Sequence, residues 1–250
     1  MGLNEEQKIF YFKYGYLLIK KLISKEECEK YLLHIEKLNK GEKKLIGFKR
    51  SKGSSSYKGR TFNQHLYDSN VLNFLIYPKF KKLLEDCFGQ QAEGIQTMHF
   101  FQGSEHPLHQ DQYYLPDCMS AWIAMEDVND ENGPLCLQPK SHLGRLITKK
   151  EIPLQQKGET YEQQQTNRYF PLIKKIADEN NIPIINILAK QGDVLLFHGR
   201  LIHGGSALLK KNSTRHSLAC HYIPYTSSNW DRDWPRISFD ETRRVKYNSQ

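Results

Sequence analysis

The pattern of residue types along the chain changes at residue 93, and this change constrains the fold more than any other feature. From there on, short runs rich in β-branched and aromatic residues alternate with turn residues such as those at 131–134. Runs of this kind predict short antiparallel strands. The expected strands are Ile95–Phe101, Leu108–Tyr113, Ser120–Glu126, Leu135–Gln138, Ile184–Leu188, Val194–His198 and Arg215–Tyr222. Such a series favours two packed sheets, a jelly roll of the cupin type.

The residues before 93 read mostly as helices. Positions 5–39 look helical around a short extended piece, Tyr16–Ile19. Ser24 and Glu27 form a capping box before one helix, and Pro78 stands at the start of another. Helices followed by strands predict an α+β chain with a mainly β core, a double-stranded β-helix, flanked by N-terminal helices.

At 250 residues the chain fits one domain with a sizeable core. We expect one domain over 1–250. It is composed of a mostly helical N-terminal segment, residues 1–92, with a basic loop 49–60, then a jelly-roll core 93–225 with an insertion 143–181, and a tail 226–250.

Composition narrows the class of protein further. Hydrophobic residues at 38% and charged residues at 26% are typical of a soluble globular chain, and no apolar run is long enough to cross a membrane. The first residues lack the pattern of a secretory signal, and the five cysteines include no CxxC pair. We therefore expect a reduced, cytoplasmic protein. The sequence does not indicate an oligomeric state.

The net charge of +8 has two readings. The simpler reading is a lysine-rich solvated surface. The sharper reading is a positive field that attracts a small anionic substrate. Nucleic acid is a weaker prediction, because no motif accompanies the charge.

The segment Pro107–Tyr114 carries two candidate metal ligands, His109 and Asp111. In an extended chain, residues two apart lie on the same face, so an imidazole and a carboxylate can grip one ion. The segment 191–206 offers two further histidines, His198 and His203, followed by small residues that let the backbone turn close to a metal. Two histidines and one carboxylate leave three coordination positions free, as in non-haem Fe(II) oxygenases.

Arg215 follows twelve residues after His203. A 2-oxoglutarate that chelates iron through its keto acid has a distal carboxylate in need of a cation. The guanidinium fork suits that carboxylate. Ser217 would share a strand face with Arg215 and add a hydroxyl.

Three segments, HQDQYY at 109–114, AWIAMEDVNDENGPLCLQPKSH at 121–142 and GDVLLFHGRLIHGGSALLKKNSTRHSLACHY at 192–222, carry a resemblance that extends more weakly to the first helices. In this order they resemble the phytanoyl-CoA dioxygenase family of Fe(II)/2-oxoglutarate oxygenases. The resemblance implies a jelly-roll core, the cofactors Fe(II) and 2-oxoglutarate, and O2 as oxidant. It assigns the metal to His109, Asp111 and His203, the distal carboxylate to Arg215, and a pocket wall to Trp122.

Several further residues are weaker candidates. Gln110, with Ser217 and Trp122, is expected to help bind the co-substrate. The candidates for substrate contact are Tyr113, His198, Lys49 and Arg50, the last two on a basic loop that would act as a lid. For each of these, packing or a solvated surface is the alternative interpretation. The loop between Asp111 and Trp122 is shorter than in acyl-CoA-hydroxylating members, so the resemblance does not extend to that substrate.

The predicted reaction is hydroxylation of an unactivated C–H bond in a small or medium anionic molecule, with release of succinate and CO2. Asp111 argues against halogenation, because the related halogenases have a small residue there. Three alternatives stay open: desaturation or oxidative cyclisation in natural-product biosynthesis, nucleic-acid dealkylation, and a non-catalytic cupin-like binding protein. Nucleic-acid dealkylases with this set of residues usually carry a second arginine soon after the first on that strand, and the run 215–220 has no second one.

Overall fold

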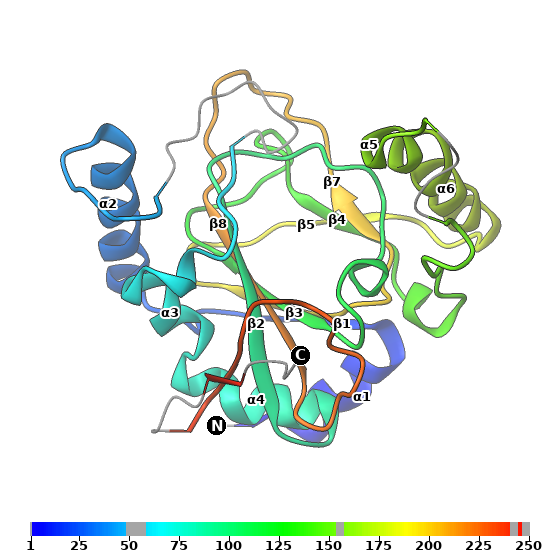
Figure 1. Cartoon of the computed structure of the whole chain (residues 1–250), viewed down its shortest axis with the longest axis horizontal. Coiled ribbons are helices and arrows are strands. Elements are labelled where there is room, and N and C mark those ends of the chain that lie inside the picture. Colours follow the sequence, from blue (N-terminus) through cyan, green and yellow to red (C-terminus); the bar gives the residue numbers. More distant parts are fainter. Residues whose placement is uncertain (1, 49–58, 154–157, 241–244, 247–250) are drawn as a thin grey trace.

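A computed structural model describes residues 2–48, 59–153, 158–240 and 245–246, the last two by their backbone only. Two antiparallel sheets form its centre (Figure 1). The larger sheet has the strand order β1-β6-β3-β8-β2-β9-β10 and the smaller one β5-β4-β7. The strands are β1 (Tyr16–Ile19), β2 (Ala92–Phe100), β3 (Met119–Ala124), β4 (Leu135–Leu137), β5 (Ile185–Ile187), β6 (Val194–His198), β7 (His203–Gly205), β8 (Ser217–Pro224), β9 (Arg236–Ser238) and β10 (Val245–Lys246).

The helices lie outside the sheets. They are α1 (Glu5–Tyr14), α2 (Lys25–Lys40), α3 (Ser69–Leu75), α4 (Pro78–Phe88), α5 (Tyr161–Gln164) and α6 (Phe170–Glu179), with short turns η1 (Gln64–Leu66), η2 (Asp111–Tyr113), η3 (Ser141–Leu143) and the π-helical η4 (Gln165–Tyr169). In Figure 1, α2 and α3 lie at one side of the molecule, and α5 and α6 at the other. The α+β class and the jelly-roll core predicted from the sequence are confirmed.

Most predicted elements are present. The capping box of Ser24 with Glu27 starts α2, and Pro78 starts α4, which ends at Gly89 in the left-handed conformation. β6 has the predicted bounds, and five other strands match within a few residues. The strand predicted at Leu108–Tyr113 is wrong, because the chain turns into η2 at Asp111. The three-residue β7 was not predicted as a strand, since it is too short for alternation to show.

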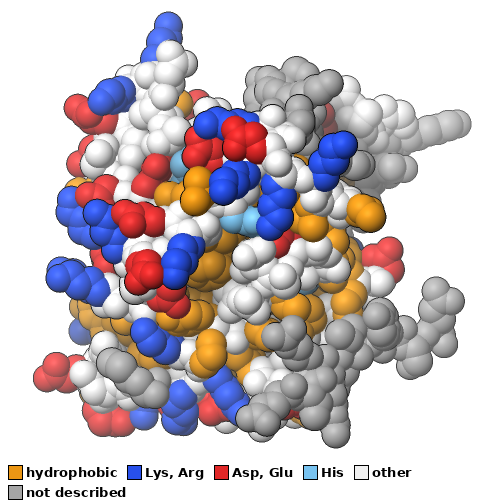
Figure 2. Space-filling view, turned by 90° about the vertical axis from the view of Figure 1, so that its left-hand side faces the viewer, with side chains coloured by type: hydrophobic (Ala, Val, Ile, Leu, Met, Phe, Trp, Pro, Cys, Tyr) orange, Lys and Arg blue, Asp and Glu red, His pale blue; other side chains and the backbone are white. Residues whose placement is uncertain are grey.

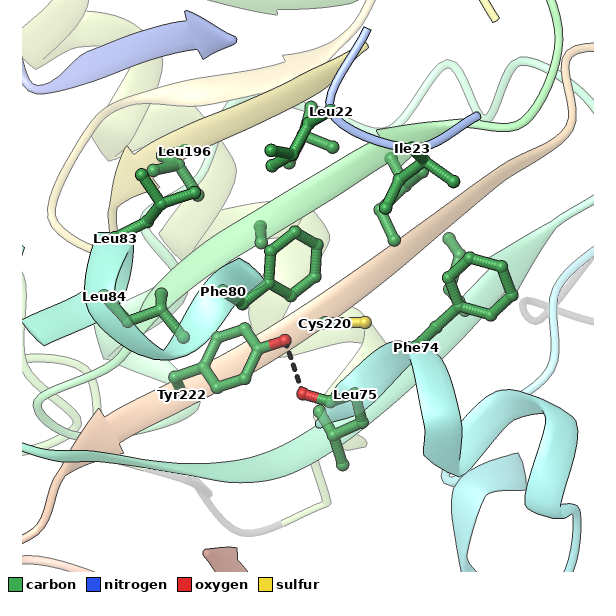
Figure 3. Close-up of a cluster of buried hydrophobic side chains, with 14 of the residues drawn as sticks. Leu22, Ile23, Phe74, Leu75, Phe80, Leu83, Leu84, Leu196, Cys220 and Tyr222 are labelled. Atoms are coloured by element: carbon green, nitrogen blue, oxygen red, sulfur yellow. Dashed lines mark hydrogen bonds between the residues drawn. The ribbon is translucent and has the colours of Figure 1, made fainter. Parts of the chain in front are cut away.

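The outer face of the larger sheet packs against the N-terminal helices. Leu218, Cys220 and Tyr222 alternate along β8 and point into this layer. Figure 3 shows Tyr222 among the side chains of α3 and α4, where its hydroxyl donates a hydrogen bond to the carbonyl oxygen of Leu75 at 2.8 Å. Its ring meets Phe80 edge to face. The apolar residues of the helices therefore hold β8 in place from outside.

The inner face of the larger sheet closes over the smaller sheet. Trp122 on β3, Phe197 on β6 and Ala219 on β8 pack with Leu135 and Leu137 of β4. Because side chains alternate along a strand, the residues of β8 that point inward are the odd-numbered ones. This alternation places the residues of the candidate site between the two sheets.

The surface that carries α2 is mixed in charge. Figure 2 shows Lys and Arg interspersed with Asp and Glu on the face seen from the left of Figure 1. On α2 itself, Lys25, Lys30 and Lys40 each pair with a glutamate one turn away. Exposed pairs of this kind contribute little to stability. No helix in the described ranges is both long and apolar enough to cross a bilayer.

Candidate active site

A pocket opens between the two sheets and combines an apolar wall with a few charged groups. Met98, Phe100, Trp122, Leu135 and Phe197 line the apolar wall. The polar side of the pocket includes Arg215 and the three predicted metal ligands, His109, Asp111 and His203. Pockets of this composition are typical of binding sites for small molecules.

The backbone brings the two predicted histidine ligands together. His109 and His203 form an antiparallel bridge, with N–H to carbonyl distances of 2.8 and 3.0 Å, and their ring centroids lie 4.2 Å apart. Both Nε2 atoms face Oδ1 of Asp111, at 3.4 Å from His109 and 3.5 Å from His203. One donor atom from each residue lies within 4.8 Å of the others, so the three side chains could hold one metal ion.

The tautomers of both histidines also suit a metal. Nδ1 of His109 lies 2.9 Å from the carbonyl oxygen of Pro107, and Nδ1 of His203 lies 2.9 Å from that of Leu201. A carbonyl oxygen only accepts, so each Nδ1 carries the proton. Each Nε2 is then left with a lone pair that points at the space beside Asp111, which is the arrangement of metal-binding histidines.

The convergence of His109 and Asp111 rests on a single extended residue. Gln110 between them has φ −121° and ψ 125°, and η2 begins at Asp111. One extended residue is enough to place its two neighbours on the same side. His109 and Asp111 therefore lie on the same side of the chain, as predicted, although the strand predicted at Leu108–Tyr113 is absent.

Glycines after His203 allow the segment 104–109 to approach closely. A Cβ on Gly204 would lie 2.7 Å from the carbonyl oxygen of His106, and one on Gly205 would lie 2.8 Å from Oγ of Ser104. Larger residues would push the 104–109 segment away and separate the two histidines. The expectation that small residues let the backbone close on the site is confirmed.

The surroundings of Asp111 and His203 keep both side chains in the protonation states that can bind a cation. Burial alone would raise the pKa of Asp111, but His203, His109 and His221 around it hold this pKa well below its usual value. Burial and the neighbouring His109 lower the pKa of His203 to about 4. Near neutral pH the carboxyl is therefore ionised and His203 is neutral.

Arg215 is a buried cation with no carboxylate partner within ion-pair distance among the described residues. It is 3% exposed, and its guanidinium donates from Nη1 to Oγ of Ser217 at 3.1 Å and from Nη2 to the carbonyl oxygen of Gln102 at 3.4 Å. Its Nε has no hydrogen-bond partner in the described portion of the chain. The guanidinium also lies 5.4 Å from the ring centroid of Trp122. The expected contact of Ser217 with Arg215 is present, and Trp122 lines the pocket.

Two other predicted residues point elsewhere. Gln110 donates to the carbonyl oxygens of Arg145 and Arg200 and accepts from the N–H of Ile147, so its carboxamide connects the insertion to the segment that carries His109 and Asp111. Tyr113 stacks on Tyr169 at 4.0 Å, in the core beneath the insertion. None of these contacts leaves Gln110 or Tyr113 facing the pocket. These placements correct the expectation that both reach the pocket.

His198 is also placed outside the pocket. Its Nδ1 accepts the backbone N–H of Arg200 at 3.1 Å, and its ring lies 5.4 Å from that of His142. The family resemblance favours His203 over His198 as the ligand, and the geometry agrees. Lys49 and Arg50 lie outside the described residues.

Two residues that the sequence analysis left aside complete the surroundings of Asp111. Ser120 donates its hydroxyl to Oδ2 of Asp111 at 2.8 Å, and Nε2 of His221 lies 3.5 Å from the same oxygen. Alternation with Arg215 and Ser217 along the strand indicates that His221 points inward. That signal was available in the sequence.

Comparisons with known proteins identify the family of the chain. The phytanoyl-CoA dioxygenase (PhyH) family profile matches residues 11–217. The human peroxisomal phytanoyl-CoA dioxygenase is 29% identical over 241 residues, covering 88% of this chain and 68% of the relative. A probable phytanoyl-CoA dioxygenase of Caenorhabditis elegans is 28% identical over 245 residues, covering 88% and 75%.

Solved structures share the fold. EctD from S. alaskensis, with 2-oxoglutarate and 5-hydroxyectoine, superimposes with a TM-score of 0.67 at 18% identity, over 89% of this chain and 76% of that one. The 2-oxoglutarate-dependent carbocyclase SnoK from nogalamycin biosynthesis gives 0.66 at 17% identity, over 94% and 86%.

Fold, donor set and family profile together define a non-haem iron dioxygenase, an oxidoreductase that uses Fe(II), 2-oxoglutarate and O2. Within that class, the chain belongs to the phytanoyl-CoA dioxygenase family.

Proposed function

We propose that His109, Asp111 and His203 hold the iron and that Arg215 binds the distal carboxylate of 2-oxoglutarate. The enzyme then hydroxylates an unactivated C–H bond of a small or medium organic molecule with an anionic group. We further propose that residues 1–250 act as one domain and that the protein works in the cytoplasm, which its five buried, unpaired cysteines fit.

The observation that carries this proposal is the buried guanidinium of Arg215 in a pocket that also contains a metal-binding donor set. A buried charge without a counter-ion is costly, so proteins pair such groups or use them to bind a ligand. Burial lowers the pKa of Arg215 to about 10, which still leaves it charged near neutral pH. A dicarboxylic keto acid would supply both the chelating end for the metal and the carboxylate for Arg215.

The chain's own residues have separable tasks in this proposal. Iron held by His109, Asp111 and His203 would, with 2-oxoglutarate and O2, supply the oxidant for the C–H bond, and CO2 and succinate would be released. Arg215 and Ser217 orient the co-substrate, and the apolar residues around Trp122 and Phe100 exclude water. Desaturation and oxidative cyclisation would use the same groups, so the geometry is compatible with either outcome of C–H attack.

Arg60 supports the anionic character of the substrate. It pairs with Phe100 along one edge of β2, while β8 pairs with the other edge, so Arg60 and Arg215 flank Phe100. Both guanidinium carbons lie 5.7 Å from the Phe100 ring centroid, and both residues line the pocket. His106 adds no charge, because burial, His109 and Arg60 lower its pKa to about 3.

Anaerobic titration with Fe(II) and then 2-oxoglutarate tests the assigned site. We expect a weak visible charge-transfer band that appears only when both are present, because the keto acid must chelate the metal. In air, a metabolite screen read out as succinate should identify substrates. Absence of the band, together with no oxygen-dependent succinate, would favour the alternative of a non-catalytic cupin-like binding protein.

The anionic substrate is tested with the hit from that screen. Arg60→Gln should raise the KM for this substrate by about 10- to 100-fold and leave the KM for 2-oxoglutarate unchanged, because a charge-assisted contact is lost on one side of Phe100 only. Arg60→Lys should recover some of the loss. Lys174→Gln, on the exposed face of α6, is the control. An unchanged substrate KM in Arg60→Gln would refute this assignment.

A further inference from the structure

Ser120 and His221 form a matched pair on neighbouring strands. They are direct register partners in the antiparallel ladder of β3 and β8, and directly opposed residues point to the same face. Here that face is the inner one. Ser120 is fully buried, and His221 is 2% exposed. Both reach the same atom, Oδ2 of Asp111.

The two oxygens of Asp111 are therefore divided between two tasks. Oδ1 faces Nε2 of His109 and Nε2 of His203 at 3.4 and 3.5 Å. Oδ2 receives the Ser120 hydroxyl at 2.8 Å and faces Nε2 of His221 at 3.5 Å. Oδ1 thus faces the proposed metal site, and Oδ2 faces Ser120 and His221 on the larger sheet.

The tautomer of His221 follows from its surroundings. Its Nδ1 is buried and has no hydrogen-bond partner within the described ranges, whereas its Nε2 faces a carboxylate. A carboxylate only accepts, so the ring is suited to carry a proton on Nε2. Among the described residues, the carboxylate of Asp111 is thus the polar group that Nε2 of this buried histidine faces.

We propose that Ser120 and His221 clamp Oδ2 of Asp111 and so enforce one-oxygen ligation of the iron, an inference that rests on the proposed metal site. A carboxylate that is free to turn could bind through both oxygens and occupy a fourth coordination position. The reaction requires three open positions, two for 2-oxoglutarate and one for O2. The clamp keeps the third position available, and both residues are positioning residues that act through Asp111.

The test removes each half of the clamp separately. Ser120→Ala deletes the hydroxyl, and His221→Phe keeps the ring but deletes the N–H. We expect each variant to weaken Mn(II) affinity, measured by calorimetry, by about 10-fold, as for other groups that orient a metal ligand. The double variant should lose more than the product of the two single losses, because each partner alone still holds the oxygen. His221→Gln, which restores an N–H donor, should recover some of the affinity.

A spectroscopic measurement separates positioning from general damage to the fold. When the Fe(II)-loaded variants are titrated with 2-oxoglutarate without air, we expect a weaker visible band than in the wild type, because a two-oxygen carboxylate competes with the chelate. Cys220→Ala is the matched control. Cys220 is the fully buried neighbour of His221 on the outer face of β8, so its loss should lower the Tm without changing metal affinity.

The outcomes distinguish this inference from the proposed function. If the wild type binds neither Mn(II) nor Fe(II) with 2-oxoglutarate, the metal site itself is wrong. If the wild type binds both and the two single variants stay within about twofold of it in affinity and band intensity, only the clamp is refuted. Equal losses in Cys220→Ala and His221→Phe would also refute it, because the effect would then be structural.

Discussion

Asp111→Asn will abolish iron binding while the metal-free protein remains folded. Asparagine has the shape of aspartate and still accepts the hydrogen bond from Ser120 through its amide oxygen, so the packing between β3 and η2 is preserved. It lacks the negative charge that the two imidazoles need beside them to hold a dication. We expect metal affinity to fall by more than about 100-fold, beyond the 10- to 100-fold typical for groups behind the ligands.

Thermal unfolding with and without metal measures this loss. A ligand at about 100 times its Kd stabilises the folded state by about 2.7 kcal/mol, which is a readily measured rise in Tm. The wild type should show this rise with Mn(II) or with Fe(II) kept anaerobic, and Asp111→Asn should show none. A normal metal-dependent rise in the variant would mean that the ion binds elsewhere.

A pair of histidine variants sharpens the same test. His198 is the last residue of β6 and His203 follows it by five residues, so the sequence alone offers either as a ligand. Of these two histidines, His203 is the one whose Nε2 faces Asp111. His203→Gln should therefore lose the metal-dependent rise in Tm, and His198→Gln should keep it. The reverse result would overturn the assignment of the third ligand.

Two of the three proposed metal ligands, His109 and Asp111, could be predicted from the sequence because they are locally encoded. His109 and Asp111 are separated by one residue, and a single extended residue brings them to one side whether or not a strand continues. The bridge between His109 and His203 is a long-range contact that spacing does not encode. Only the resemblance to a family selected His203 over His198.

Gln110 and His221 were placed wrongly or left aside because the alternation of side chains along an extended chain was not applied to them. If His109 and Asp111 share a side, Gln110 between them must point to the other, and its carboxamide indeed meets Arg145, Ile147 and Arg200. The inward direction of His221 followed from Arg215 by the same alternation. The contact of both Ser120 and His221 with one carboxylate oxygen depends on the register of β3 against β8, which a single sequence does not specify.

Arg215→Met will stabilise the metal-free protein and weaken its binding of 2-oxoglutarate, because the buried cation lowers stability but binds the co-substrate. The pKa of Arg215 is lowered from 12.5 to about 10 by burial, which means that the folded metal-free protein holds this charge unfavourably, by an energy on the order of 3 kcal/mol. Methionine has a similar length and no charge, and replacing a poorly compensated buried ion with an apolar side chain is often stabilising. We therefore expect the Tm of the metal-free variant to rise.

The same substitution should remove the anchor for the co-substrate. Losing one partner of a buried, hydrogen-bonded charge pair costs about 2–5 kcal/mol, so the affinity for 2-oxoglutarate should fall by at least about 30-fold while Fe(II) still binds. The anaerobic visible band, titrated with 2-oxoglutarate, measures this directly. The affinity of Arg215→Lys for 2-oxoglutarate should lie between those of the wild type and Arg215→Met, because lysine keeps the charge but not the two parallel hydrogen bonds of a guanidinium. Arg145→Met, an exposed arginine paired with Glu151, is the control and should change neither quantity. A variant that loses stability and keeps its affinity for 2-oxoglutarate would show that the guanidinium of Arg215 serves the packing of β8 against Trp122 and not the binding of a dicarboxylate.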